Sequence, residues 1–334
     1  MSPALAQRLW GFPDAFAHPL TLWITVAVGA VLAIAAAAIT GLSLAGKLTP
    51  ALRRELWQRT LSWGAIAPIL GLPILAGAFW TILAITIIAI FCYREYARAT
   101  GLFRERAVSA MTVIGILFVY FAALDHWYGF FMALIPLGVI TIAAVSIPLD
   151  QPRGYIERVG LAVFGFLLFG SALGHLAYIA NDASYRPLIL MILVTVSLND
   201  VFAFTVGKTL GGPKLCPNTS PNKTISGSLG ALVLTTLLVT FLAGFVFAGT
   251  SLEYLPHRLA LGVMVGALGQ LGDLMLSSIK RDLGIKDMGA TIPGHGGVLD
   301  RCNSLLLVAP AIFHYVNYFL GIGADMPARV FGGS

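Results

Sequence analysis

Long apolar runs recur along the whole chain, and they constrain the fold more than any other feature. Within its 334 residues, runs of about twenty apolar residues are each long enough to cross a bilayer as a helix. A helix satisfies its backbone polar groups within one segment, as hydrocarbon requires, whereas a membrane barrel would show short alternating strands. Only 11% of the residues are charged, against about a quarter in soluble domains. We therefore predict an all-α polytopic membrane protein.

The apolar runs predict about ten membrane-spanning helices. Between Leu61 and Tyr96 the sequence allows either one long tilted helix or two helices joined by a tight turn, and the interruption GLPILAG favours the turn. The expected spans are Leu20–Ala45, Leu61–Ala76, Ala78–Tyr96, Ala107–Leu124, Phe130–Pro148, Val159–Ile179, Pro187–Val206, Ser228–Ala248, Arg258–Ser278 and Asn303–Gly321.

Lysines and arginines concentrate in alternate loops of this ten-helix arrangement. Seventeen of the 21 basic residues fall on one side, which the positive-inside rule assigns to the cytoplasm. We therefore expect an integral protein of the cytoplasmic (inner) membrane, with both termini outside the cytoplasm. This bias accounts for the net charge of +6, so the charge needs no nucleic-acid partner to explain it, and we expect none. Basic residues at the helix ends are expected to contact the headgroups of membrane lipids. Cys92, Cys216 and Cys302 show neither metal-ligand spacing nor a disulfide framework.

One polar region begins within the seventh expected helix and continues into the loop that follows it. Its sequence is SLNDVFAFTVGKTLGGPKLCPNTSPNKTISGSLGA. Asp200 lies well inside an apolar run, where ionisable residues are costly and usually functional; alternatively, Asn199 or Asp200 supplies a hydrogen bond between helices. Downstream, Ser220, Lys223 and Thr224 combine hydroxyl groups with an amine, which is typical of phosphate-binding loops. No GxxxxGK[ST] P-loop is present, so this loop alone is a weak signal.

The second polar region, SSIKRDLGIKDMGATIPGHGGVLDRCNS, concentrates charge in a chain that otherwise avoids it. In the helix that leads into it, Asp273, Ser277 and Lys280 are spaced to project from one face, with Arg281 close to that face. The loop then adds five polar residues: Lys286, Asp287, His295, Asp300 and Arg301. The loop can therefore return a second carboxylate beside the one on the helix.

These residue types favour metal-assisted chemistry on phosphates. Carboxylates at such a membrane surface hold divalent cations, and the neighbouring basic residues bind phosphate oxygens. Phosphoryl or nucleotidyl transfer needs that division of labour, with little covalent chemistry for the protein. Oxygen ligands without a His/Cys cluster favour magnesium over zinc. His295, between two glycines, is a zinc ligand, a general base or, more simply, a residue whose hydrogen bonds order the loop.

The charged loop resembles the signature of the CDP-diacylglycerol synthases, also called phosphatidate cytidylyltransferases. SPNKT is similar to that family's S-P-[KN]-K-T element, Asp200 matches its acidic residue in the preceding helix, and QRTLSWGAIAPI and REYARATGL resemble its first helical hairpin. The resemblance covers about Trp57 to Gly321. The residues that fill the signature are Ser277, Lys280, Arg281, Lys286, Asp287, Pro293, His295, Gly296, Gly297, Asp300 and Arg301.

The resemblance implies a reaction and roles for these residues. CTP and phosphatidic acid would give CDP-diacylglycerol and pyrophosphate, a step of phospholipid biosynthesis, with one or two magnesium ions; a homodimer is a family-level expectation. By position, Asp273 and Asp300 match the metal ligands, and with Lys280 and Arg281 they make up the expected catalytic set. The residues expected to bind substrate are Ser220, Lys223, Thr224, Ser277, Lys286, Asp287, His295, Arg301 and Asp200.

The chain also departs from the family pattern. Residues 1–56 form an N-terminal extension with one extra membrane helix, before a cytidylyltransferase-like domain of residues 57–322 and a short tail of residues 323–334. Cys302 and Asn303 stand where the family has an apolar residue and an aspartate, and Ser226 replaces a glutamate. Losing two carboxylates weakens the hold on a cation, so a divergent member is expected.

Other functions stay open from the sequence alone. The same chemistry could act on another lipid phosphate, such as a polyprenyl or ether-lipid phosphate, and a CTP-dependent lipid kinase is a more distant enzyme alternative. A weakly active homologue that binds lipid or a partner is a further one. A transporter would use Asp200 and Asp273 as an ion site, but the charges cluster on one face and the two halves of the sequence are not similar.

Overall fold

Helices form nearly all of the described chain. The computed structural model describes residues 3–292, 296–324 and 329–331. Nine of the helices in these ranges are long and apolar enough to cross a membrane, which confirms the predicted all-α polytopic class. They are α2 (Pro19–Leu44), α3 (Pro50–Ala76), α4 (Ala78–Ala99), α5 (Arg106–Leu124), α6 (Tyr128–Val145), the stretch Tyr155–Ile179, α9 (Tyr185–Leu210), α10 (Ile225–Val246) and α11 (Leu255–Asp282).

Shorter helices complete the chain. The stretch Tyr155–Ile179 consists of α7 (Tyr155–Gly165), the π-helical segment η4 (Phe166–Ala172) and α8 (Leu173–Ile179). The tenth predicted span is the shorter apolar helix α13 (Leu305–Leu320), which follows the one-turn helix α12 (Leu299–Cys302). The remaining pieces are α1 (Pro3–Trp10) and the 3-10 turns η1 (Phe12–Asp14), η2 (Leu102–Arg104), η3 (Ile147–Leu149) and η5 (Ser251–Glu253).

A tight turn at Gly77 divides the stretch that could have been one long helix. α3 ends at Ala76 and α4 begins at Ala78, so the two-helix prediction is confirmed. Gly77 has a φ of +138°, and a Cβ atom there would lie 2.3 Å from the carbonyl oxygen of Leu9 in α1. Only glycine tolerates both this backbone angle and this close approach. α1 therefore packs directly against the turn between α3 and α4.

α3 begins well before its apolar run. Thr49 caps the helix by accepting a hydrogen bond from the Leu52 N–H at 3.3 Å, and Pro50 takes the first helical position. The early turns are polar and include an ion pair between Arg59 and Glu55 at 2.7 Å, so hydropathy could not locate this start. The predicted boundary between residues 56 and 57 falls within α3, and the division into domains stays a prediction.

A small two-stranded sheet, which the sequence did not reveal, lies between α9 and α10. β1 (Lys214–Cys216) pairs antiparallel with β2 (Ser220–Thr224). Strands this short, with proline and lysine in place of alternating apolar residues, leave no period-two pattern. Thr224 ends β2 and caps α10, because its hydroxyl oxygen accepts a hydrogen bond from the Gly227 N–H at 3.1 Å. The cap fixes the place of Lys223, which lies two residues before the first residue of α10.

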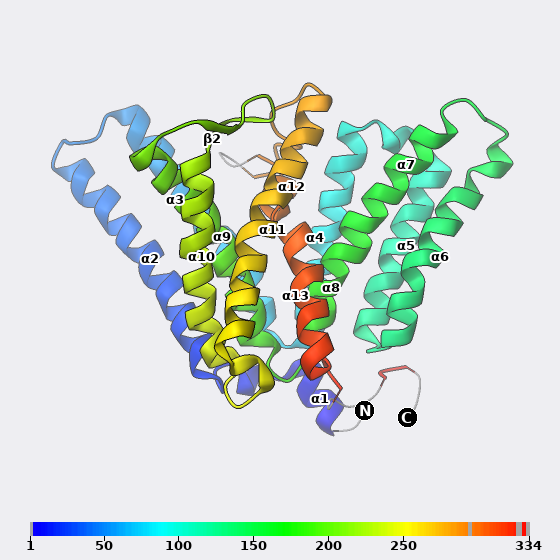
Figure 1. Cartoon of the computed structure of the whole chain (residues 1–334), viewed down its shortest axis with the longest axis horizontal. Coiled ribbons are helices and arrows are strands. Elements are labelled where there is room, and N and C mark those ends of the chain that lie inside the picture. Colours follow the sequence, from blue (N-terminus) through cyan, green and yellow to red (C-terminus); the bar gives the residue numbers. More distant parts are fainter. Residues whose placement is uncertain (1–2, 293–295, 325–328, 332–334) are drawn as a thin grey trace.

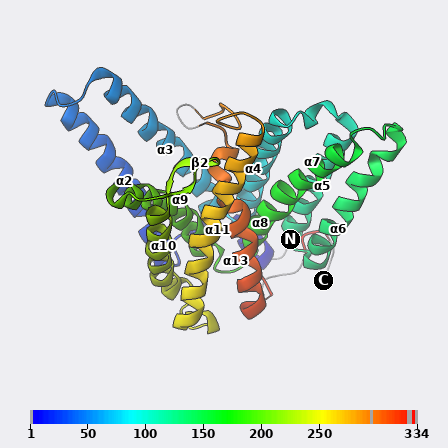
Figure 2. The same cartoon turned by 45° about the horizontal axis from the view of Figure 1, so that its top comes forward.

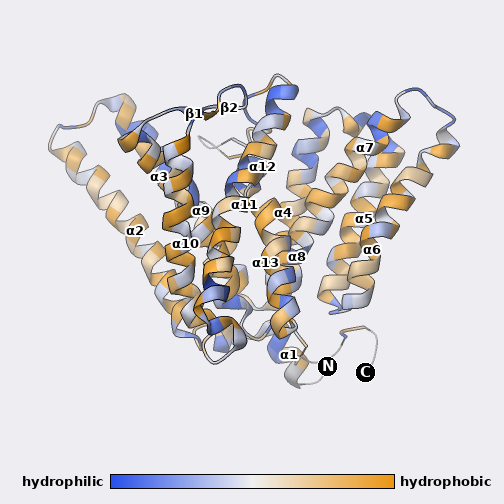
Figure 3. Ribbon diagram, viewed as in Figure 1, coloured by the Kyte–Doolittle hydropathy of each residue, from blue (hydrophilic) through white to orange (hydrophobic). Residues whose placement is uncertain are grey.

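The helices spread from a packed centre (Figure 1). α9 and α11 both pack against α10, and α13 packs against α11 and α8. α2 and α3 extend on one side of this centre and α5, α6 and α7 on the other (Figures 1 and 2). Apolar residues dominate the middle of the helices, while hydrophilic residues gather near their ends and in the loops (Figure 3).

The loops that carry most of the basic residues share one face. The connections α2–α3, α4–α5, α6–α7, α9–α10 and α11–α12 all lie at the top of Figure 1, and α1 lies at the opposite face. We call the face with the β-hairpin the loop face. The alternation of helices therefore agrees with the predicted grouping of charge, and the assignment of the loop face to the cytoplasm stays a prediction.

An aromatic core holds α4 in the middle of the bundle. Tyr96, Phe131, Phe166, Phe169 and Phe313 are each at most 1% exposed. They come from α4, α6, η4 and α13, and the ring of Tyr96 contacts that of Phe169 at 5.6 Å between centroids. Large rings packed in this way leave little freedom to the helices that carry them. The C-terminal turns of α4 are thus rigidly placed beneath the loop face.

Candidate active site

Two lysine–aspartate ion pairs link β2 to α11 and α11 to α12 near the loop face. Lys223 of β2 pairs with Asp273 of α11. Nearer the end of α11, Lys280 pairs with Asp300 of α12 at 2.9 Å. The four side chains are only 5 to 19% exposed, and charges at that depth are costly unless they are paired. The structure thus brings together four charged residues that the sequence analysis predicted as site residues. They come from β2, α11 and α12.

Both carboxylate oxygens of Asp273 have partners. Lys223 faces Oδ2, and the side-chain amide of Asn303 donates to Oδ1 at 2.5 Å. The orientation of that amide is fixed, because its oxygen accepts a hydrogen bond from the Ser304 N–H at 2.8 Å. Gly272 allows this contact, since a Cβ there would lie 2.6 Å from the Asn303 carbonyl oxygen. Asn303 therefore contributes a neutral donor directly to the site.

Asp300 orders the segment between α11 and α12. Its Oδ1 faces Lys280, and its Oδ2 accepts hydrogen bonds from the backbone N–H groups of Met288 and Gly297, both at 2.9 Å. Hydrogen bonds to an ionised carboxylate are shorter and stronger than neutral ones. One side chain thus ties the end of α11, the connecting segment and α12 to each other.

A second buried carboxylate, Glu95 of α4, holds the same segment, and the sequence analysis missed it. Its Oε1 accepts hydrogen bonds from the Thr291 hydroxyl at 2.6 Å and the Val298 N–H at 3.1 Å. Its Oε2 accepts from the Leu299 N–H at 2.9 Å, at the first residue of α12. A Cβ on Gly297 would lie 2.3 Å from Oε2, so this segment closes tightly over the carboxylate. Nothing local in REYAR marks Glu95 as buried.

The sequence left two roles open for Asn199 and Asp200: a hydrogen bond between helices and a functional carboxylate. The structure assigns a different role to each residue. Asn199 is buried, accepts a hydrogen bond from the Thr235 hydroxyl at 2.9 Å and donates to the Gly266 carbonyl at 3.3 Å. It therefore joins α9 to α10 and α11. Asp200 is exposed beside it, and its charge interacts with those of Asp273, Lys223 and Arg301. The structural role belongs to Asn199, and Asp200 adds a third carboxylate near the ion pairs.

The β-hairpin is fastened to α11 and closed upon itself. Arg281 is exposed and donates through Nε to the Thr219 carbonyl at 3.3 Å. The hydroxyl of Ser226 donates to the Gly211 carbonyl and lies 3.1 Å from the hydroxyl of Thr224. Ser226, at the position where the family pattern has a glutamate, thus links the two ends of the hairpin connection by a hydrogen bond. Thr224 has a structural role as the N-cap of α10.

The other substrate-binding candidates differ in exposure. Ser277 is buried on α11, and Ser220 is half-buried at the start of β2. Three charged candidates are exposed around them: Lys286, Asp287 and Arg301. His295 lies outside the described residues, so its role stays a prediction.

The donor set is compatible with magnesium. The described part of the chain contains no group of three or more His, Cys, Asp or Glu side chains placed to hold a metal ion. Magnesium needs less from the protein, because one or two carboxylates plus substrate phosphates bind it. A carboxylate has about four lone-pair sites, of which Asp273 uses two and Asp300 three in these contacts. Both aspartates therefore keep acceptor capacity for a cation.

Comparison with known sequences shows the family. A model of the cytidylyltransferase family matches residues 57–319, most of the chain. The chain belongs to the cytidylyltransferase family. The resemblance to the CDP-diacylglycerol synthases is thereby confirmed, and the protein is a member of an enzyme family of membrane nucleotidyltransferases. Residues 1–56 lie outside the match.

Relatives support a divergent position within the family. An uncharacterised Escherichia coli K12 protein, YnbB, is 29% identical over 270 residues, 79% of this chain and 88% of its own length. A phosphatidate cytidylyltransferase of Bacillus subtilis strain 168 is 32% identical over 221 residues, 64% of this chain and 81% of its own length. One from Rickettsia bellii is 35% identical over 164 residues, 47% of this chain and 70% of its own.

Glu95→Gln should loosen the segment between α11 and α12. The variant replaces one acceptor oxygen by an NH2 group, which leaves a backbone donor unsatisfied at a cost of about 1–3 kcal/mol. We expect a lower unfolding temperature and faster tryptic cleavage after the exposed Lys286. Glu157→Gln, at an exposed position of α7, is the matched control and should change neither. Wild-type cleavage in the Glu95 variant would contradict the assigned role.

Proposed function

We propose that the protein transfers the cytidylyl group of CTP to phosphatidic acid, forming CDP-diacylglycerol and pyrophosphate. The observation that carries the proposal is the pair of contacts Lys223–Asp273 and Lys280–Asp300 near the loop face. Carboxylates that can hold a cation, beside amines that can bind phosphate oxygens, suit a triphosphate next to a lipid headgroup. The family match and the names of the relatives support these substrates.

In the proposed reaction, a phosphate oxygen of the lipid attacks the α-phosphorus of CTP. A new P–O bond forms, the bond from the α-phosphorus to the bridging oxygen breaks, and its electron pair leaves with pyrophosphate. Lys223, Lys280 and Arg281 bind phosphate oxygens and offset their charge. The aspartates hold the two lysines in place before substrate arrives. Such positioning and electrostatic stabilisation supply most of the catalysis in phosphoryl transfer.

Magnesium is the proposed cofactor, as one or two ions held by Asp273 and Asp300. When bound, it would neutralise phosphate charge and stabilise the attacking and leaving oxygens. The two lysines that now face these carboxylates would exchange that contact for phosphate oxygens of the substrate. Asp200, whose charge acts on Asp273, would add to the attraction for a cation.

We further propose that the loop face lies in the cytoplasm and the protein in the inner membrane. Seventeen of the 21 basic residues support this orientation, which places the site on the side where CTP is found. The spanning helices expose large apolar side chains along their length, as contact with lipid requires. A homodimer stays a family-level expectation.

A second candidate keeps the chemistry and changes the lipid acceptor. The contact of Asn303 with Asp273 favours it, because a neutral amide replaces a family carboxylate beside the proposed metal ligand. A less negative site could accept a different lipid phosphate, such as a polyprenyl phosphate.

Labelled CTP tests the proposal. Purified protein is incubated with magnesium, α-labelled CTP and a panel of phosphatidic acid, an ether-linked analogue and a polyprenyl phosphate. We expect label in the product of phosphatidic acid; label only in another lipid would support the second candidate instead. A parallel reaction with γ-labelled CTP identifies a kinase, in which only the γ label reaches the lipid. Absence of turnover with every acceptor would overturn the enzyme assignment.

Asn303→Asp should raise the affinity of the site for magnesium. The change removes the donor to Asp273 and places two carboxylates in contact, and a divalent cation relieves their repulsion. We expect the half-saturating magnesium concentration for turnover to fall several-fold, and the metal-free protein to unfold at a lower temperature. Asn317→Asp makes the same charge change near the opposite end of α13 and should shift neither value. An unchanged magnesium dependence in the Asn303 variant would count against a metal beside Asp273.

A further inference from the structure

One side of α4 carries a continuous row of exposed side chains. The row begins with large apolar residues that are three or four positions apart: Trp80, Leu83, Ile87 and Phe91. This spacing puts them on one face of the helix. Because α4 is long and apolar enough to span the membrane, exposed apolar side chains on it contact the acyl chains of lipids.

Two arginines continue the same row toward the end of α4. Arg94 follows Phe91 at the next helical position of the row, Arg98 follows one turn later, and both side chains are exposed. α4 runs from the turn at Gly77 to the loop face (Figure 1), so the two guanidinium groups lie where the helix meets the lipid headgroups. The row is therefore apolar along the membrane and cationic at its surface, as a bound anionic phospholipid requires.

The two arginines can bind one phosphate together. Residues four apart on a helix have Cβ atoms about 5–6 Å apart, so two long side chains reach the same anion. Each guanidinium presents N–H groups in a planar fork that matches phosphate oxygens. Two like charges at this spacing destabilise a helix, and the helix dipole offsets only Arg98, which lies in the last turn. An anionic headgroup would remove the repulsion.

No carboxylate in the described part of the chain pairs with Arg94 or Arg98. Glu95 lies between them in sequence but is buried, and its two carboxylate oxygens already accept hydrogen bonds from N–H groups at the start of α12. The next acidic residue along the chain, Glu105, faces Arg158 at 3.7 Å. The positive charge at the end of α4 is therefore open to an anion from the membrane.

The connection from α4 to α5 adds positive charge beside the two arginines. η2 packs against both helices, and Arg104 and Arg106 are exposed there. Phe103 of η2 is 52% exposed, and the guanidinium of Arg104 lies over its ring at 5.7 Å. An exposed aromatic ring beside basic residues is typical of a surface that lies among lipid headgroups. The charge of this surface complements a lipid with net negative charge.

The basic residues of α3, on the same face of the protein, lack this arrangement. Arg59 pairs with Glu55 at 2.7 Å. Arg53 and Arg54 are adjacent in sequence, so their side chains do not face each other on the helix. The general excess of basic residues at the loop face thus does not account for two arginines one turn apart at the end of a lipid-facing row.

We propose that an anionic phospholipid binds along α4, with its phosphate on Arg94 and Arg98 and an acyl chain on the apolar row that precedes them. The lipid carries net negative charge, because a zwitterionic headgroup would bring a second cation close to the arginines. The site lies outside the proposed catalytic centre, so its occupancy does not depend on the proposed reaction.

Lipid binding to the full-length protein in detergent, measured by native mass spectrometry, tests the proposal. The protein is titrated with phosphatidylglycerol, or with phosphatidylcholine of the same acyl chains, and CTP and magnesium are omitted. Phosphatidic acid is left out because the proposed active site would also bind it. We expect phosphatidylglycerol to bind at least several-fold more tightly than phosphatidylcholine, since the two lipids differ in net charge.

Variants locate the bound lipid. Arg98→Gln should weaken phosphatidylglycerol binding about fivefold, as the loss of one basic residue near an anionic headgroup predicts, and adding Arg94→Gln should weaken it further. Arg54→Gln removes an exposed arginine of α3 that has no second arginine one turn away, so it is the matched control and should bind normally. Equal binding of the two lipids, wild-type affinity in the double variant, or an equal loss in the Arg54 variant would overturn the proposal.

Discussion

Two carboxylates under the loop face supply acceptors for a backbone that would otherwise have none. Glu95 and Asp300 accept hydrogen bonds from N–H groups at Met288, Gly297, Val298 and Leu299. Because unsatisfied buried N–H groups are costly, these carboxylates determine the path of the segment between α11 and α12. The position of α12 relative to α11, and with it the contact of Asn303 with Asp273, depends on that path.

The sequence predicts the features that hydrophobicity and helical spacing control. The apolar runs predicted the positions of the spanning helices, and the interruption GLPILAG predicted the turn at Gly77. Helical spacing predicted that Asp273, Ser277 and Lys280 share one face of a helix. Contacts between distant segments leave no such local mark. The pairing of Lys223 with Asp273 and the reach of Glu95 across about two hundred positions of sequence arise only when the helices pack. The sequence did not predict the β-hairpin, because strands of three and five residues are too short to show an alternation of apolar and polar residues.

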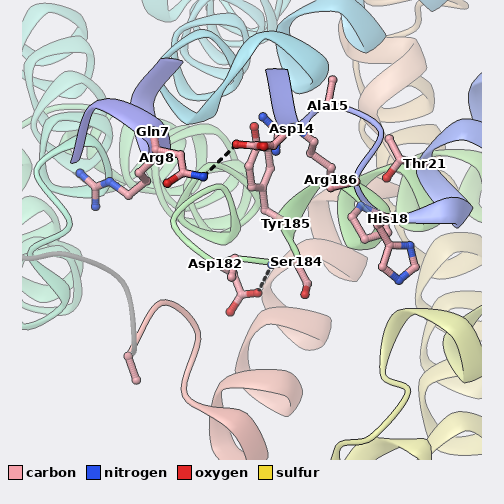
Figure 4. Close-up of a pocket in the computed structure, with 14 residues that line it drawn as sticks. Gln7, Arg8, Asp14, Ala15, His18, Thr21, Asp182, Ser184, Tyr185 and Arg186 are labelled. Carbon is pink, nitrogen blue, oxygen red and sulfur yellow. Dashed lines mark hydrogen bonds between the residues drawn. The ribbon is translucent and has the colours of Figure 1, made fainter. Parts of the chain in front are cut away.

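The distribution of charged residues in the protein follows from the bilayer that surrounds its helices. Hydrocarbon excludes isolated charges, so ionisable residues gather where the helices meet the headgroups or are paired within the protein. The loop face concentrates ion pairs around α11, and the opposite face carries a cavity with two arginines. A membrane enzyme that joins a soluble nucleotide to a lipid phosphate needs its polar groups at the first of these places. The cavity on the opposite face (Figure 4) lies outside the proposed reaction.

The central claim is that Lys223 and Lys280, held by their aspartates, receive the phosphates of CTP. Equilibrium binding of labelled CTP to the purified protein, with magnesium and without lipid, tests it most directly. Lys223→Gln and Lys280→Gln should each weaken CTP binding by about tenfold or more, as loss of a charge-assisted contact predicts, while Lys47→Gln, in the α2–α3 loop of the same face, should leave it unchanged. CTP binding of wild-type strength in both lysine variants would contradict the account.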